Sequence, residues 1–160
     1  MIHFRINMAP RGQGRPRARA FAGHASVYKA GKDRVHETTI ASLSAQHQPV
    51  IPIDYAVQLD IVVITPRPAG LNHISKRTGQ PTGNIERTWN TSKPDADNYA
   101  KAVMDALAAF WIDDKLVVDL RVVKVVAAYN ESPGFEITIR HAGVVVGTLL
   151  DTTLSVSEVF

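Results

Sequence analysis

Alternating apolar and polar positions predict the strands of this chain. Hydrophobic side chains alternate with polar ones over residues 2–8, 55–63 and 135–140, and a valine-rich run spans 117–126. Alternation is typical of a strand with one buried face, and a continuous apolar run is typical of a buried strand. Pro10 and Pro66 end the first two strands, and residues 130–134 supply the turn before the last one. The pattern therefore predicts four strands.

Three- and four-residue spacing predicts two helices. Residues 33–46 contain no helix breaker, and Asp33 can cap a helix whose apolar positions are Val35, Ile40, Leu43 and Ala45. We interpret this helix as packing material. A second helix is predicted over residues 98–110, with Asp97 as its N-cap. Its buried face would consist of Tyr99, Val103, Ala106, Leu107 and Phe110.

The order of these elements is strand, helix, strand, helix, strand, strand. It predicts an α+β fold: a single domain over residues 1–142, with a four-stranded mixed sheet and two helices. A length of 160 residues and an apolar content of 45% suit one hydrophobic core. Residues 143–160 are apolar and β-prone, and we treat them as an extension of unknown role. They could form an extra strand, a dimer contact or a frayed end.

Charge is distributed unevenly within a net charge of +3. The first 36 residues hold eight lysines and arginines against one acid, whereas residues 95–119 hold six acids against two bases. Glycines and prolines around the early arginines predict a mobile basic loop that contacts phosphates through Arg11, Arg15, Arg17 and Arg19. A solvated loop is the alternative. The asymmetry indicates that a polyanion is held by the basic N-terminal region and processed at the acidic region.

A long polar segment, residues 67–93, joins the second strand to the acidic region. Loops of this length inside a compact domain are usually functional or disordered. Its basic side chains are candidates for phosphate contacts beside the acidic region: Lys76, Arg77, Arg87 and Lys93. Trp89 could stack on an exposed base, but we favour a core anchor.

Several classes of site and location are disfavoured. The chain has no cysteine, which excludes disulfides, zinc thiolate sites and thiol nucleophiles. His36 and His47 show no metal-ligand spacing, so we assign them no chemistry. The first residues lack the apolar core of a signal peptide, and no apolar run approaches membrane-spanning length. We therefore expect a cytoplasmic protein without a membrane partner.

The acidic region has the composition of a metal site. In an extended chain, Asp95 and Asp97 would direct both carboxylates to one side. Lys101 follows Asp97 by four residues and precedes Asp105 by four, so all three would share a helix face. If the turn at Asp113 and Asp114 folds back, the oxygens of Asp95, Asp97 and Asp114 would suit Mg²⁺, for which Mn²⁺ could substitute. Asp113 and Asp105 are further candidate ligands.

Each of these features also has a simpler interpretation. An isolated Asp-x-Asp pair is usually a solvated turn, Asp97 could serve only as a cap, and Lys101 could serve only as its ion-pair partner. The metal-site interpretation is favoured because the three groups lie on one short strand, helix and turn unit. A metal held there would activate water for attack on a phosphodiester and neutralise the leaving oxygen.

The pattern K-P-D-x-D-N-x-x-K-A-x-x-D-A-L, followed by an aromatic residue, D-D and V-V-x-x-x-V-x-K, resembles the RusA family of Holliday junction resolvases. These are magnesium-dependent dimeric endonucleases, often carried by prophages. The resemblance covers about thirty residues. It implies that Asp95, Asp97 and Asp114 bind the metal and that Lys101 is the essential lysine. Tyr99 departs from the pattern, since a leucine is usual there.

These inferences lead to three hypotheses of function. The first is a magnesium-dependent endonuclease that resolves four-way junction DNA in recombination and repair. Its paired symmetric nicks need two sites, which one acidic cluster per chain supplies only in a homodimer. The second is a module that binds branched DNA without cutting it. The third is a metal-dependent nuclease acting on flaps or single strands.

Overall fold

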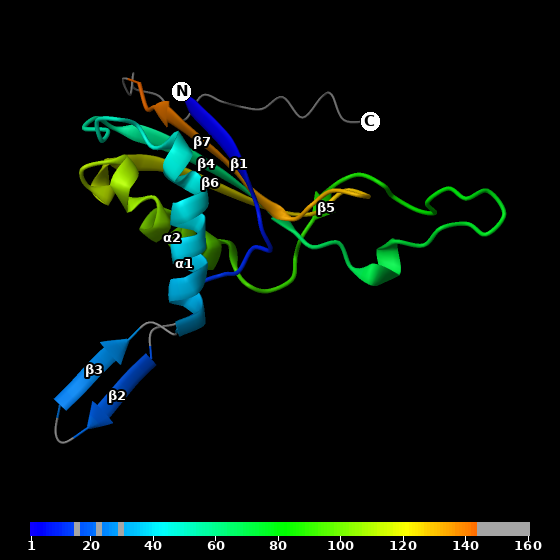
Figure 1. Cartoon of the computed structure of the whole chain (residues 1–160), viewed down its shortest axis with the longest axis horizontal. Coiled ribbons are helices and arrows are strands. Elements are labelled where there is room, and N and C mark those ends of the chain that lie inside the picture. Colours follow the sequence, from blue (N-terminus) through cyan, green and yellow to red (C-terminus); the bar gives the residue numbers. More distant parts are fainter. Residues whose placement is uncertain (15–16, 22–23, 29–30, 144–160) are drawn as a thin grey trace, which may run out of the picture.

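A central five-stranded sheet and two helices form the body of the protein (Figure 1). The computed structural model describes residues 1–14, 17–21, 24–28 and 31–143. The strands are β1 Ile2–Asn7, β2 Arg17–Phe21, β3 His24–Tyr28, β4 Val57–Thr65, β5 Thr88–Trp89, β6 Val117–Val126 and β7 Gly134–His141. The helices are α1 Gly31–Ser44 and α2 Ala96–Ala106, with 3-10 turns at Ala45–His47, Ala69–Leu71, Ala108–Phe110 and Asp114–Leu116.

The sheet is mixed, as the sequence predicts, and its strand order is β1-β7-β4-β6-β5. β4 runs parallel to β6, and the other neighbouring strands are antiparallel. The predicted count of four strands in this sheet is one too few. β5 consists of two residues that pair with the end of β6, Thr88 with Val126 and Trp89 with Val125. A strand of two residues is too short to produce a periodic pattern.

Both helices contribute to the main core on one face of the sheet. Phe4 of β1, Leu59 of β4, Ile40 of α1 and Val103 of α2 belong to a single buried cluster. The five apolar residues predicted for the face of the second helix are all buried, but α2 ends at Ala106, and Phe110 lies in the separate 3-10 turn Ala108–Phe110. The opposite face of the sheet carries polar pairs such as Asp60 and Arg140. The α+β single-fold prediction is therefore confirmed.

α1 lies close to its predicted position, but it buries a different stripe. Its buried side chains are Asp33, His36, Ile40 and Ser44. Val35 and Leu43, which the apolar pattern placed inside, are 69% and 42% exposed. Asp33 is buried within the first turn, where its carboxylate accepts hydrogen bonds from residues 11–14. α1 therefore turns a different face toward the core than predicted, because its buried Asp33 and His36 bind residues 11–14.

Two further predictions need correction. Part of the predicted mobile basic loop forms an antiparallel hairpin of β2 and β3. Trp89, predicted as a core anchor, is 76% exposed because β5 lies at the edge of the sheet. Arg15 and the extension beyond residue 143 lie outside the described residues. No helix in the described part of the chain is long and apolar enough to cross a membrane.

The segment between β4 and β5 extends away from the sheet as an arm, residues 66–87 (Figure 1). Arg67 binds the base of the arm, because its guanidinium donates to the carbonyl oxygens of Leu71, Asn84 and Ala127. Arg87 closes the other side through ion pairs with Glu131 and Glu136. The arm is therefore fixed to the sheet at both of its ends.

Candidate functional site

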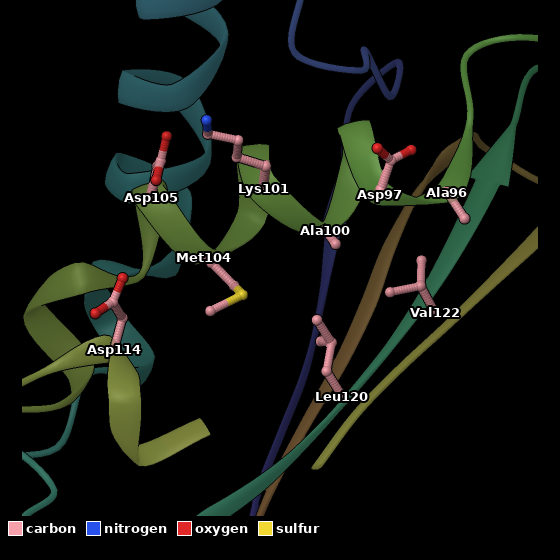
Figure 2. Close-up of a pocket in the computed structure, with 9 residues that line it drawn as sticks. All are labelled: Ala96, Asp97, Ala100, Lys101, Met104, Asp105, Asp114, Leu120 and Val122. Carbon is pink, nitrogen blue, oxygen red and sulfur yellow. The ribbon is translucent and has the colours of Figure 1, made fainter. Parts of the chain in front are cut away.

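A pocket of about 490 Å³ lies between α2, β6 and the turn that precedes β6 (Figure 2). Its charged residues are Asp97, Lys101, Asp105 and Asp114. Met104 extends from α2 toward the strand that carries Leu120 and Val122, and these three side chains supply an apolar wall. The pocket therefore places three carboxylates and one ammonium beside a hydrophobic surface.

Helical geometry explains most of this arrangement. Asp97, Lys101 and Asp105 are four residues apart, and Figure 2 shows Lys101 between the two aspartates along α2. The predicted shared face is confirmed. Asp114 comes from the 3-10 turn after α2 and reaches the same pocket, so the acidic turn does fold back toward the helix. Sequence positions 97 and 114 are brought together by the short connection between α2 and β6.

The Asp-x-Asp pair differs from its predicted form. Asp95 is the N-cap residue of α2, with extended backbone at φ −71° and ψ 158°, while Asp97 lies in the first helical turn. The prediction of an extended pair with Asp97 as cap is therefore wrong. Asp95 makes no capping hydrogen bond with its side chain. Its carboxylate is thus not used to hold the helix end.

A second pocket, of about 510 Å³, lies against the first turn of α2 and contains Asp95. Asp97 lines both pockets, and Lys93 lies on the rim of the second. The opposite wall is the segment Gly12 to Gly14, which approaches from the N-terminal side. Asp97 therefore joins two adjoining pockets, one lined by Asp114 and Lys101 and the other by Asp95.

The donor chemistry of these pockets suits a hard divalent cation, but the predicted set of three carboxylates is not assembled. Within residues 1–14 and 31–143, no group of three or more acidic or histidine side chains is placed to hold one ion. Mg²⁺ is commonly bound through one or two carboxylates together with waters and substrate phosphates. Asp95 and Asp97 at one pocket fit that mode, with Asp114 across the adjoining pocket.

Asp113 has a structural role. Its side chain accepts a hydrogen bond from the backbone N–H of Lys115 at 3.0 Å and pairs with the Lys115 ammonium at 3.0 Å. These hydrogen bonds, the backbone one first, lower the pKa of Asp113. Asp113 thereby caps the turn that presents Asp114, and it lines a neighbouring pocket rather than the one with Lys101.

The predicted DNA-binding residues are spread over three regions. Lys93 lies beside Asp95 and Asp97. Lys76 and Arg77 are exposed on the arm, and neither lines the two acidic pockets. Arg17 and Arg19 belong to β2.

Two of the predicted arginines are engaged within the protein. Arg11 donates from Nε to the buried Asp33 at 3.1 Å, with half of its side chain exposed. Arg87 donates from Nε to Glu131 at 3.0 Å and also pairs with Glu136. Hydrogen bonds from Arg87 hold the pKa of Glu131 at about 2, and they lower that of Glu136. Arg87 is thus a residue of the arm's base.

Sequence reasoning missed the residues that support the second pocket. His36 is buried, and its Nε2 accepts a hydrogen bond from the backbone N–H of Arg11 at 3.2 Å. Burial, and then the Arg11 guanidinium, lower the pKa of His36, against the opposing effect of Asp33, so the ring is held neutral. Lys124 donates to the carbonyl oxygens of Ser92 and Pro94. Of these residues, only Lys124 stood out in the sequence, because it is the final lysine of the motif V-V-x-x-x-V-x-K.

The chain matches the protein-family model of endodeoxyribonuclease RusA over residues 7–140. It is 34% identical over 141 residues to the uncharacterized protein YqaN of Bacillus subtilis (strain 168), covering 88% of this chain and 96% of that relative. It is 49% identical over 51 residues to the crossover junction endodeoxyribonuclease RusA of Escherichia coli O139:H28 (strain E24377A / ETEC), covering 31% of this chain and 41% of that relative. The family match spans both acidic pockets.

Proposed function

Because the chain belongs to the RusA endodeoxyribonuclease family, we propose that it resolves four-way DNA junctions by magnesium-dependent, paired nicks. The observation that carries this proposal is the joining of Asp97, Lys101 and Asp114 in one pocket, although 17 positions separate the two aspartates along the chain. A module that only binds DNA gains nothing from carboxylates at that position, since they repel phosphates. The pocket therefore favours phosphodiester hydrolysis over binding alone.

The side chains divide the work of hydrolysis. Asp95 and Asp97 would hold Mg²⁺, or Mn²⁺ in its place, with Asp114 facing the same region from the turn before β6. The metal, when bound, supplies Lewis-acid activation of water and neutralises charge on the phosphate. Lys101 lies one helical turn from Asp97, where its ammonium can orient the attacking water or stabilise the negative charge that develops in the transition state. Lys93 on the rim can bind an adjacent phosphate.

Junction resolution also implies a homodimer. Two strands must be cut, and each chain contributes one group of Asp97, Lys101 and Asp114. A two-fold assembly presents two such pockets in symmetric positions, which matches the symmetry of a four-way junction. The proposed partners are therefore junction DNA and a second copy of this chain.

A cleavage assay with defined substrates tests this proposal. Purified protein is incubated with a synthetic four-way junction, a flap and a single strand, with Mg²⁺ or with a chelator. We expect the junction to be cut by paired nicks only with metal, and Asp97→Asn to lower the rate about a thousandfold, equivalent to ~4 kcal/mol. Asp54→Asn, at an exposed position outside both pockets, is the matched control.

Three outcomes would count against the proposal. Cleavage in the presence of chelator would refute the metal requirement. Wild-type turnover by Asp97→Asn would refute the catalytic role of the pocket. Faster cleavage of flaps or single strands than of the junction would favour the nuclease alternative instead.

A further inference from the structure

The segment Gly12 to Gly14 forms one wall of the pocket that contains Asp95, and this wall is held rigidly. The backbone N–H of Gln13 donates to the carbonyl oxygen of Asn98 at 2.9 Å, which ties residues 11–14 to the first turn of α2. The backbone N–H of Gly14 donates to Asp33 at 3.1 Å, and that of Arg11 donates to His36 at 3.2 Å. Two helices therefore fix this short segment in place.

Close packing also requires glycine in this wall. A Cβ added at Gly12 would lie 2.6 Å from Cβ of Pro94 and 3.1 Å from Cβ of Asn98. Pro94 immediately precedes Asp95, so the wall is in direct contact with the chain that presents the first carboxylate. The position of Gln13 relative to Asp95 and Asp97 is consequently set by several independent contacts.

Gln13 lines this pocket but leaves one polar atom unused. Gln13 is 7% exposed, and in the described part of the chain its Oε1 has no hydrogen-bond partner. Buried amide oxygens in proteins are nearly always paired, so an unpaired one within a rigid wall indicates a missing partner. Oε1 is a hydrogen-bond acceptor, and Gln13 lines the same pocket as Asp95 and Asp97, so the missing partner is a cation or a hydrogen-bond donor and a phosphate oxygen is excluded.

We propose that the carboxamide oxygen of Gln13 completes a divalent-cation site with Asp95 and Asp97, either as a direct ligand or through a metal-bound water. Amide and carboxylate oxygens are the hard donors that Mg²⁺ and Mn²⁺ select. The inference rests on the proposed function, and it accounts for the absence of a three-carboxylate group among the described residues. The third protein oxygen comes from an amide on the N-terminal segment.

Metal binding by the DNA-free protein tests this inference without a cleavage readout. Mn²⁺ affinity is measured by the loss of the free-ion electron paramagnetic resonance signal for wild type, Gln13→Met and Gln13→Glu. We expect Gln13→Met to weaken Mn²⁺ binding tenfold or more, as losing a metal-supporting oxygen typically does. Gln13→Glu keeps an oxygen at that position and should bind Mn²⁺ at least as tightly as wild type. Gln46→Ala, an exposed glutamine outside the pocket, is the control.

Thermal unfolding separates a metal role from a structural one. Because Oε1 is unpaired, Gln13→Met should unfold at or above the wild-type temperature without metal and lose only the stabilisation that Mn²⁺ adds. Wild-type Mn²⁺ affinity in Gln13→Met overturns the inference, as does a loss of affinity in both Gln13 variants. If Asp97→Asn also binds Mn²⁺ like wild type, the proposed metal site itself fails. If Asp97→Asn loses Mn²⁺ while Gln13→Met retains it, only the role of Gln13 is refuted.

Discussion

Lys124 Nζ lies 2.6 Å from the carbonyl oxygen of Pro94, the residue immediately before Asp95. The same ammonium lies 2.6 Å from the carbonyl oxygen of Ser92. A half-buried lysine of β6 therefore holds the end of the chain that enters α2. The first carboxylate of the site is positioned from the sheet as well as from its own helix.

Removing this lysine should loosen the site without altering its acidic groups. Lys124→Met leaves two carbonyl oxygens without their charged donor, which should cost roughly 1.5–3 kcal/mol of unfolding free energy. We also expect at least about a tenfold loss of junction cleavage, because small displacements of positioning groups strongly reduce rate. Urea unfolding and single-turnover cleavage measure the two effects. Lys32→Met, at an exposed position of α1, should change neither, and full activity of folded Lys124→Met would refute the positioning role.

Asp113 and Asp114 are neighbours with identical chemistry and different surroundings. Only Asp114 lines the pocket with Lys101, whereas Asp113 caps the turn. Asp114→Asn should lower cleavage about a hundredfold or more with little effect on stability. Asp113→Asn keeps a capping oxygen for the Lys115 N–H, so it should change stability little and lower cleavage less than about tenfold. Equal losses of activity in the two variants would contradict this division.

Lys101 should act on the rate of cleavage and not on junction affinity. Lys101→Ala removes the ammonium next to Asp97, and we expect a rate loss of about 10²- to 10³-fold that added Mg²⁺ does not restore. Lys101→Arg should also fail, because a planar guanidinium cannot replace a compact ammonium. Single-turnover rates at saturating protein separate chemistry from binding. A Lys101→Ala protein that cuts at the wild-type rate once bound would reduce the residue to an ion-pair partner.

Salt dependence should distinguish arginines that contact DNA from those engaged within the protein. Each phosphate contact contributes about −0.9 to the slope of log affinity against log salt concentration. Replacing Arg17 and Arg19 together by alanine should flatten the slope by up to ~2. Arg87→Ala should leave the slope unchanged, because that guanidinium is ion-paired with Glu131 and Glu136. Fluorescence anisotropy of a labelled junction measures the slope, and an unchanged slope in the double variant would exclude β2 from the DNA interface.

Acid should destabilise the protein through the base of the arm. Hydrogen bonds from Arg87 lower the pKa of Glu131 from 4.5 to about 2. A depressed carboxyl pKa stabilises the fold above pH 4.5, and this contribution is lost as the pH falls toward 2. Because solvent screens this partly exposed ion pair, the loss should be on the order of 2 kcal/mol in unfolding free energy, below the full value of the pKa shift. Glu131→Gln should weaken the protein at pH 7 and flatten this pH dependence, whereas the exposed Glu86→Gln should not.

Periodicity predicted the parts of the fold that are governed by burial. Strands β1, β4 and β7 and helix α2 bury apolar residues at regular spacing, so their positions follow from sequence. The valine-rich run also forms a strand, β6, but the prediction that it is buried is wrong, because only its Val125 is buried. The same rule fixed the shared face of Asp97 and Lys101, since it depends only on a single helix. It misjudged α1, where the buried stripe includes Asp33 and His36. Polar groups that are buried to hold another segment are invisible to a hydrophobic pattern.

Contacts between distant segments account for the remaining errors. The hairpin of β2 and β3 contains alternating arginine and alanine, RARAF, which reads as a basic loop. Asp95 and Asp97 were expected to form an extended pair, but the helix begins at Ala96, so only Asp95 has extended backbone. The wall containing Gln13 depends on packing against Pro94 and Asn98, more than 80 positions away. No local window of sequence contains that information.

Because the base of the arm is closed, the length of the arm can change without altering the rest of the molecule. Asn90 donates from Nδ2 to the Thr65 hydroxyl at 2.7 Å, so the chain returns to the point where it left the sheet. Insertions or deletions between Arg67 and Arg87 would change only the reach of the arm, because loop closure depends weakly on loop length. The length and sequence of this arm can therefore diverge between related chains while the two acidic pockets keep their geometry.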